Sequence, residues 1–519
     1  MNRKWWTLVV VCAATFMLLL DVTIVVVALP DIQQSLSASF SALQWVTDAY
    51  ALALAALLLT SGSLADRLGR RRVFGAGLVV FTAGSLLCGL ATGPLMLIVS
   101  RALQGVGGAM LFATSLALLA ATYHGRDRGT AFGAWGAITG VSTALGPILG
   151  GLIATSIGWR GIFLVNLPIG LLALLATRYR VDESRAPHAR RLDRAGLVTF
   201  TCGLLALVYG VITAGERRWG DPVVLCSLGL AAVLAIVFVL IEKRTAEPMF
   251  DLSLLRTPTF LGGSIAAFTM NGSLFAMLLY LVLYLQEDQG FSALETGVRL
   301  LLVSGFTMVV ATVSGRLSGR VPVRGLIGSG LLLVGVGLMA MGGLDADSAW
   351  TRLIPGLILC GIGSGLVNPP LASTAVGVVS VQHSGMASGF NNTCRQVGIA
   401  VGIAVYGSLF TARLRDGLAG HLADRPGVAD RAGQLADAVH DGRAQAVLMS
   451  LPGADRAAAG RAIHAAFAEA LDTLCVVSGA VAVLGAVCAV LLIRGRDFLP
   501  THPGTTGSTP SDTVAAPVG

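Results

Sequence analysis

One carboxylate and one guanidinium stand in long apolar stretches of this 519-residue chain, and both groups can do chemistry there. Asp21 lies in LLLDVTIVVVALP (Leu18 to Pro30), and Arg101 lies in LIVSRALQGVGGAM (Leu97 to Met110). A carboxyl group held away from water favours its neutral form, so it can take up a proton and release it when its surroundings change. An arginine keeps its positive charge and can pair with a carboxylate or with a bound molecule.

The elements that must hold these residues are membrane-spanning helices. The chain is 55% hydrophobic and 12% charged, and its apolar residues form long blocks. A helix needs about 20 mostly apolar residues to cross a bilayer. Fourteen such blocks can be placed, and we therefore predict an all-α polytopic membrane protein. The expected spans are 6–29, 43–64, 73–91, 95–119, 130–155, 162–179, 195–213, 222–241, 259–285, 292–314, 325–343, 352–377, 388–410 and 467–493.

The depth of Asp21 gives it a functional interpretation and a structural one. It lies about 15 residues into the first span, or roughly 22 Å at 1.5 Å per residue. A carboxylate so deep in the bilayer costs about 2.5–3.5 kcal/mol, so we expect it to face a cavity or a partner. Alternatively, Asp21 only holds helices together by hydrogen bonds, and Arg101 belongs to a fixed ion pair.

Positive charges orient the spans. With the N-terminus in the cytoplasm, the cytoplasmic segments hold 22 Lys and Arg and the short outer loops hold four. Cytoplasmic loops carry this excess in membrane proteins, so we expect a multi-pass protein of the inner (cytoplasmic) membrane with both termini in the cytoplasm. The topology explains the net charge of +8, and no basic cluster remains to indicate binding to nucleic acid. The N-terminal apolar run is interpreted as an uncleaved first helix.

Motifs of enzymes, cofactor sites and metal sites are absent from the sequence. The eight Cys lie within or beside apolar spans and form no CxxC pair. Neither of the two Lys, Lys4 and Lys243, follows a Gly, so there is no phosphate-binding P-loop. No His stands in HExxH and no Ser in G-x-S-x-G. We predict no enzyme activity, no cofactor and no metal site.

The spans divide into six, two and six along the chain. Residues 1–180 form the predicted N-terminal six-helix bundle, 181–258 hold two additional helices with their flanking cytoplasmic loops, and 259–496 form the C-terminal six-helix bundle. Within the last, 411–466 is predicted to be a long, partly helical outer loop. The Thr-, Pro-, Gly- and Ser-rich residues 497–519 are predicted to form a disordered cytoplasmic tail.

A charged loop after the second span has a degraded copy in the second half. GSLADRLGRRRVF (Gly62 to Phe74) corresponds to SGRLSGRVPVRG (Ser314 to Gly325), and such internal repeats are common in secondary transporters, with the substrate site between the halves. Arg70 to Arg72 fit positive-inside topology alone. Asp66, close to the turn-forming Gly69, can pair with neighbouring helix ends and hold one conformation, which would make the loop a gate.

A proline and several glycines stand inside the fifth span, in GPILGG (Gly146 to Gly151). Proline removes a helix hydrogen bond and glycine permits close approach, so this segment predicts a bend at a helix contact. The remaining charges in spans are weaker candidates, since a charge near a span end is cheap and an i,i+4 pair can stabilise one helix. These are Asp48, Glu242, Glu295 with Arg299, and Arg395.

Together these motifs resemble the fourteen-helix drug:proton antiporter family of the major facilitator superfamily, over roughly residues 5–495. Three further segments match motifs of that family. They are LDVTIVVVALP (Leu20 to Pro30), WRGIFLVNLPIG (Trp159 to Gly170), and the fourth-helix set Arg101, Gln104, Gly105 and Gly107. The chain departs from the family pattern at Val26, Gly161 and Gly319.

The resemblance implies two six-helix bundles plus two central helices, and it implies roles for individual residues. It assigns proton coupling to Asp21 and Arg101. It assigns a conformational gate to Gly62, Asp66, Arg67, Gly69 and Arg70. It assigns the antiporter-motif bend to Gly140, Gly146, Pro147, Gly150 and Gly151.

The expected function is proton-coupled export of small hydrophobic or amphipathic drugs across the cytoplasmic membrane by alternating access. The expected partners are the substrate, protons and the lipid bilayer, and the protein is expected to be a monomer. Two alternatives remain open from the sequence. One is a proton-coupled transporter of an ordinary metabolite, and the other is a transport-inactive membrane sensor.

Overall fold

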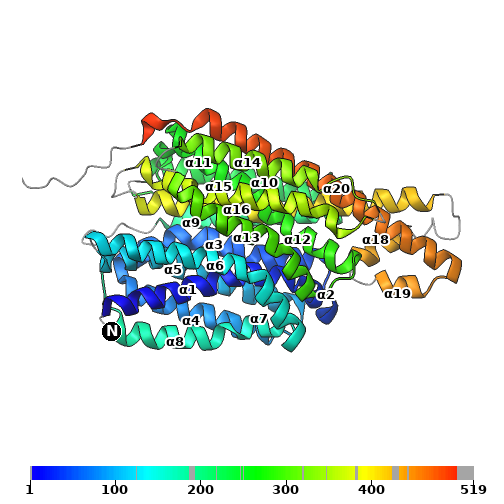
Figure 1. Cartoon of the computed structure of the whole chain (residues 1–519), viewed down its shortest axis with the longest axis horizontal. Helices are drawn as coiled ribbons and strands as arrows, with labels where there is room; N and C mark the ends of the chain where they lie inside the picture. Colours follow the sequence, from blue (N-terminus) through cyan, green and yellow to red (C-terminus); the bar gives the residue numbers. More distant parts are fainter. Residues whose placement is uncertain are drawn as a thin grey trace, which may run out of the picture.

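The computed structural model describes most of the chain as helices that run side by side along the long axis of the molecule (Figure 1). The described residues are 3–123, 125–185, 193–217, 219–245, 247–248, 250–317, 321–345, 348–379, 384–423, 432–440 and 444–498. Apart from residues 497–498, the predicted disordered tail lies outside the described residues.

The first half of the chain forms six long helices with two short ones. The elements are α1 (Arg3–Val27), the short α2 (Leu29–Leu36), α3 (Phe40–Leu68), α4 (Arg70–Gly89), α5 (Pro94–Thr122), α6 (Gly125–Ile157), the short α7 (Arg160–Leu164) and α8 (Asn166–Arg180). Two more helices follow, α9 (Arg194–Glu216) and α10 (Pro222–Arg244).

The second half begins with a span in which α-helical and π-helical segments alternate. This span consists of α11 (Pro258–Met270), the π-helix η2 (Asn271–Phe275), α12 (Ala276–Leu283) and the π-helix η3 (Tyr284–Asp288). The later helices are α13 (Ala293–Leu317), α14 (Val323–Ala340), α15 (Ile354–Gly377), α16 (Ser384–Leu422), α18 (Ala432–His440), α19 (Ala444–Met449) and α20 (Gly453–Leu492).

The predicted all-α membrane fold is confirmed. Within the described residues, thirteen helical segments are long and apolar enough to cross a membrane. The 33-residue α6, whose side chains are described only in part, takes the place of the fifth predicted span. Helices α16 and α20 have 39 and 40 residues, about twice the roughly 20 that a bilayer requires. Their ends project beyond the other helices, together with α18 and α19 (Figure 1).

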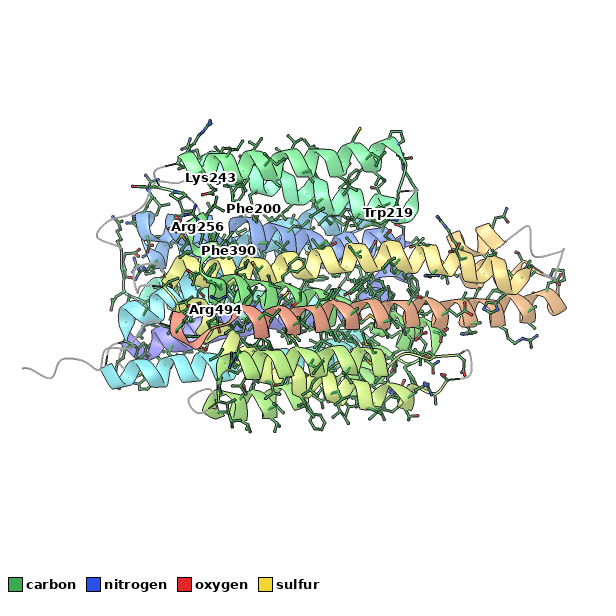
Figure 2. All side chains as sticks on the ribbon, turned by 90° about the horizontal axis from the view of Figure 1, so that it is seen from above. Phe200, Trp219, Lys243, Arg256, Phe390 and Arg494 are labelled. Atoms are coloured by element: carbon green, nitrogen blue, oxygen red, sulfur yellow. The ribbon has the colours of Figure 1, made fainter. Side chains whose placement is uncertain are left out.

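The two additional helices form a pair at one edge of the molecule. Figure 2 shows this pair at the top, with Trp219 at one end and Lys243 at the other. Arg256 and Arg494 lie at the same end of the molecule as Lys243. The inner helix of the pair, α9, packs against α3 from the first half and α16 from the second. Three of the positive side chains that the topology prediction places in the cytoplasm therefore lie at one end of the molecule.

The two halves of the chain pack tightly at the end opposite the N-terminus. The Gln44 side chain on α3 donates a hydrogen bond of 3.0 Å from Nε2 to the carbonyl of Ile403 on α16. Phe40 stacks on Phe410 with 5.5 Å between ring centroids. A Cβ atom on Gly151 of α6 would lie 2.5 Å from the carbonyl oxygen of Ala293, at the start of α13. Stacked aromatic rings and a close helix contact at a glycine therefore hold the two halves together at this end of the molecule.

We predict that Gly151→Val lowers the thermal stability of the purified protein. The added side chain has no room between α6 and α13, and overpacking of this kind costs about 1–3 kcal/mol. The matched control is Gly305→Val on α13, where a Cβ would meet nothing within 4 Å. Thermal unfolding in detergent should show a lower Tm for Gly151→Val alone. Equal Tm values for the two variants would contradict this packing account.

Candidate functional site

The structure brings the two charged residues singled out in the sequence into direct contact. Asp21 on α1 and Arg101 on α5 are 1% and 2% exposed. Arg101 Nη1 lies 2.5 Å from Asp21 Oδ2, so the pair is a buried ion pair between two helices. An isolated charge at this position would be strongly unfavourable, and each residue supplies the counter-charge of the other.

The second carboxylate oxygen of Asp21 is held by two amide side chains. Gln104 Nε2 and Asn166 Nδ2 donate to Asp21 Oδ1 at 2.8 and 3.2 Å. Both amides also donate to Ser85 Oγ, at 2.7 and 3.1 Å. Gln104 Oε1 accepts from Arg101 Nη1 at 2.6 Å. These five side chains, which we call the Asp21 network, connect α1, α4, α5 and α8.

Arg101 is fixed on its remaining sides by α3 and α7. Its Nε donates to the carbonyl of Val46 at 3.1 Å. The guanidinium lies 4.3 Å from the ring centroid of Tyr50 and 5.9 Å from that of Phe163, within the range of cation–π attraction. In this conformation Arg101 is therefore occupied by the protein and is not available to a bound molecule.

Asp21 accepts three hydrogen bonds in all. The N–H donors from Arg101, Gln104 and Asn166 point at its two oxygens and fix the position of the carboxylate.

Two glycines let the helices of the network approach closely. A Cβ on Gly84 of α4 would lie 2.8 Å from the Cα of Gln104 on α5. A Cβ on Gly105 of α5 would lie 2.5 Å from the carbonyl oxygen of Tyr50 on α3. Small residues permit such contacts in membranes, where no hydrophobic force drives helices together.

The predicted gate residues lie at the junction of α3 and α4. Arg70 donates to Asp66 Oδ1 from Nη2 at 3.0 Å and from Nε at 3.3 Å. Gly69 joins the helices with φ of 110°, which side chains rarely adopt. A Cβ on Gly69 would lie 2.6 Å from the carboxyl carbon of Glu183. The Oε1 of the same carboxylate accepts a hydrogen bond from the backbone N–H of Arg71 at 3.0 Å. All these contacts lie within the first half of the chain.

The other predicted gate residues have fewer neighbours, and the second loop is only partly described. A Cβ on Gly62 would meet nothing within 4 Å, and Arg67 is exposed. The degraded copy of the loop, Ser314 to Gly325, includes residues 318–320, which lie outside the described residues.

The glycine and proline motif lies where α6 meets helices of both halves. Pro147 is inside α6. A Cβ on Gly146 would overlap the Thr23 hydroxyl of α1. Gly150 faces Ile24 of the same helix, and Gly151 faces the start of α13. The surroundings of the fifth predicted member, Gly140, lie outside the described residues.

Residues 11–403 match the family model described as Major Facilitator Superfamily. The chain belongs to the Major Facilitator Superfamily. It is therefore a multi-pass membrane protein from a superfamily of transporters.

Three curated relatives from this superfamily are similar over most of their length. The multidrug resistance protein Stp of Mycobacterium tuberculosis (strain ATCC 25618 / H37Rv) is 38% identical over 81% of this chain and 79% of its own. The tetracenomycin C resistance and export protein of Streptomyces glaucescens is 35% identical over 94% and 91%. The puromycin resistance protein of Streptomyces alboniger is 37% identical over 81% and 84%. The predicted resemblance to drug exporters is confirmed.

Solved structures support the fold. A bacterial homologue of the human lysosomal transporter Spinster covers 96% of this chain and 99% of its own, with a TM-score of 0.65. Its sequence identity is 16%, so the likeness shows the superfamily fold alone.

Sequence reasoning missed two members of the Asp21 network and misplaced several weaker candidates. Asn166 and Ser85 received no role, although Asn166 is an amide in an apolar stretch. Asp48 is 0% exposed inside α3, so its expected position at an accessible span end is wrong. Glu295 accepts a hydrogen bond from Ser292 Oγ in place of the expected ion pair with Arg299. Arg299 lies over an aromatic ring instead, 3.6 Å from the Phe291 centroid.

We predict that Arg101→Met strongly destabilises the protein and that Asp21→Asn partly restores it. Removing one partner of a buried ion pair typically costs about 3–5 kcal/mol, because the other charge is left uncompensated. The double variant Asp21→Asn/Arg101→Met leaves no charge in the network. Thermal unfolding should rank wild type first, the double variant second and Arg101→Met last. A double variant no more stable than Arg101→Met would contradict the pairing.

Proposed function

We propose that this protein is a proton-coupled antiporter that exports hydrophobic or amphipathic drugs across the cytoplasmic membrane by alternating access. The buried Asp21–Arg101 pair is the observation that supports it best, because a superfamily transporter driven by protons needs a titratable group inside the membrane. The relatives named for tetracenomycin C export and for puromycin resistance support drugs as the substrates.

In this proposal, the structure represents the state in which Asp21 has lost its proton. The carboxylate is saturated by Arg101, Gln104 and Asn166, and the two halves are closed at the end opposite the N-terminus. Protonation of Asp21 weakens its hold on Arg101, and the helices that the network connects then change their packing. One proton charge moving down 100 mV provides about 2.3 kcal/mol for this cycle.

The contacts at the junction of α3 and α4 support a role for that loop as a gate. Asp66 and Arg70 form an ion pair that is 3.0 Å long and partly exposed, so it can exchange partners when the halves move. The positive end of the molecule faces the cytoplasm in this proposal, which places both termini there. We infer that the transporter acts as a monomer, with its substrate between the two bundles.

We predict that Asp21→Asn abolishes proton-driven export per molecule of inserted protein, although the loss of the counter-charge to Arg101 also lowers its stability. The asparagine amide has nearly the same volume as the aspartate carboxyl group, but it cannot take up and release a proton. Everted vesicles from an efflux-deficient host should show puromycin uptake that collapses the imposed pH gradient with wild type and not with Asp21→Asn. The control is Asp221→Asn, which changes a carboxylate that caps α10 through the N–H of Val223. Asn caps helices equally well, so this variant should transport as wild type does.

Coupled uptake by Asp21→Asn at the wild-type rate would remove Asp21 from the mechanism. If wild-type vesicles accumulate an ordinary metabolite in place of puromycin and the other drugs tested, the metabolite alternative is correct. If wild type transports nothing and Asp21 is freely replaceable, the protein is a transport-inactive sensor.

We predict that Gly69→Ala slows export at least about tenfold, which equals about 1.4 kcal/mol. Alanine is strained at φ of 110°, and its Cβ would displace Glu183 from the loop. The control is Gly93→Ala, since Gly93 has φ of −158° and a Cβ there would meet nothing within 4 Å. Uptake of puromycin by everted vesicles measures both variants. Equal rates for Gly69→Ala and Gly93→Ala would exclude a gating role for this loop geometry.

A further inference from the structure

The described part of the chain contains two charged side chains deep in spans that have no hydrogen-bond or ion-pair partner. One is Asp48 on α3, whose two carboxyl oxygens are buried and unpaired. The other is Arg395 on α16, whose buried Nε is unpaired. The ion pair between Asp21 and Arg101 is complete without either of them. An arginine stays charged, so Arg395 is the group that most needs a counter-charge.

Arg395 lies well inside α16. It is eleven residues from the start of α16, which corresponds to about 16 Å at 1.5 Å per residue. Two residues earlier, Thr393 Oγ1 donates to the carbonyl of Ala55 on α3 at 3.3 Å. The sequence analysis interpreted Arg395 as a charge near a span end, but its backbone lies about three turns inside the helix, beside the middle of α3.

The face of α16 that carries Arg395 contacts helices of both halves of the chain. Ser388, Asn392, Arg395 and Ile399 follow one another at spacings of four, three and four residues, so they share one face of the helix. Seven residues beyond Ile399, the same face carries Tyr406, which packs edge-to-face on Tyr280 at 6.2 Å.

One helical turn further, Phe410 stacks on Phe40 of α3 from the first half. This face therefore closes against the first bundle at the end opposite the N-terminus. The residues nearer the N-terminal end differ, since Ser388, Asn392, Arg395 and Ile399 are all partly exposed. A Cβ on Gly389 would meet Leu59 of α3, in the first half, and a Cβ on Gly398 would meet the backbone of Phe268 on α11, in the second half. The four partly exposed residues lie between these two directions around α16. We conclude that they face the region between α3 of the first bundle and α11 of the second.

We propose that Arg395 binds an anionic group of the transported substrate, such as a carboxylate or an ionised phenol or enol, in the space between the two bundles. This inference rests on the proposed export function and names a substrate class for it. The planar guanidinium can donate two parallel hydrogen bonds to a carboxylate, and such charge-assisted bonds are strong where water is scarce. Asn392, one turn earlier on the same face, supplies a further polar contact.

Asp48 is the alternative partner that the test must exclude. Gln44 contacts Ile403 and Thr393 contacts Ala55, so the antiparallel register places Asp48 about five residues, or about 7 Å, from the level of Arg395. Asp48 is also completely buried, whereas Arg395 is partly exposed. In this structure the two groups do not pair, since both oxygens of Asp48 and the Nε of Arg395 are without a partner.

The experiment compares two dyes built on one xanthene scaffold, the anionic fluorescein and the cationic rhodamine 123, in energised everted vesicles. We expect wild type to accumulate fluorescein and Arg395→Gln to accumulate it at least about tenfold more slowly. Arg395→Gln should transport a non-anionic compound, rhodamine 123 or puromycin, within about twofold of wild type, because only the anion contact is lost. The rate of fluorescein transport by Arg395→Lys should lie between the rates of wild type and Arg395→Gln, since lysine keeps the charge but not the planar donor pair.

A second variant keeps the test valid if Arg395→Gln fails to fold. Asn392→Asp places a carboxylate three residues before Arg395 on the same face, where it can pair with the guanidinium and compete with an anionic substrate. It should reduce fluorescein transport selectively, as Arg395→Gln does.

Three results would overturn the inference while the proposed export function stands. In one, wild type exports rhodamine 123 or puromycin and does not export fluorescein. In another, Arg395→Gln transports fluorescein at the wild-type rate. In the third, Arg395→Gln loses transport of all compounds equally and the double variant Asp48→Asn/Arg395→Gln regains it, which would identify an Asp48–Arg395 ion pair. If wild type moves none of these compounds, the export function itself fails.

Discussion

The ion pair between Asp21 and Arg101 is the interaction on which the interior of the first bundle depends. Two opposite charges are removed from water at a cost that only close pairing and complete hydrogen bonding can offset. The structure meets both requirements, with 2.5 Å between the charged atoms and partners on both carboxylate oxygens. These partners come from α5 and α8, and both amides also bond to Ser85 of α4. The network therefore connects Asp21 to three other helices of the bundle.

The two bundles differ in how they treat their buried charges. In the first, each charge of the central network has a partner. In the second, the buried Nε of Arg395 has none. A permanent charge of this kind is unfavourable in the empty protein and becomes favourable when an anion arrives. In the proposed mechanism, the residue that binds the proton and the residue that binds the substrate therefore belong to different bundles.

Much of the fold follows from the sequence because bilayer thickness fixes the length of each apolar block. Asp21 and Arg101 were found for a related reason, since a charge inside such a block is conspicuous. Ser85 and Asn166 were missed because uncharged polar residues are common in spans and their pairing across helices is not visible in one sequence. Asp48 was misplaced because its burial depends on the second bundle, which covers that end of α3. The lengths of α16 and α20 were underestimated because their outer parts are rich in alanine and charge, which favour helix without lipid.

In the proposed mechanism, Asp21 is the proton-carrying group and Arg101 pairs with its ionised form. Infrared difference spectroscopy of the purified protein measures this directly through the C=O stretch of a protonated carboxylic acid. If Asp21 carries the proton, this band appears in wild type on acidification, is missing from Asp21→Asn, and is already present at neutral pH in Arg101→Met. The same band in Asp21→Asn as in wild type would exclude Asp21 as the proton carrier.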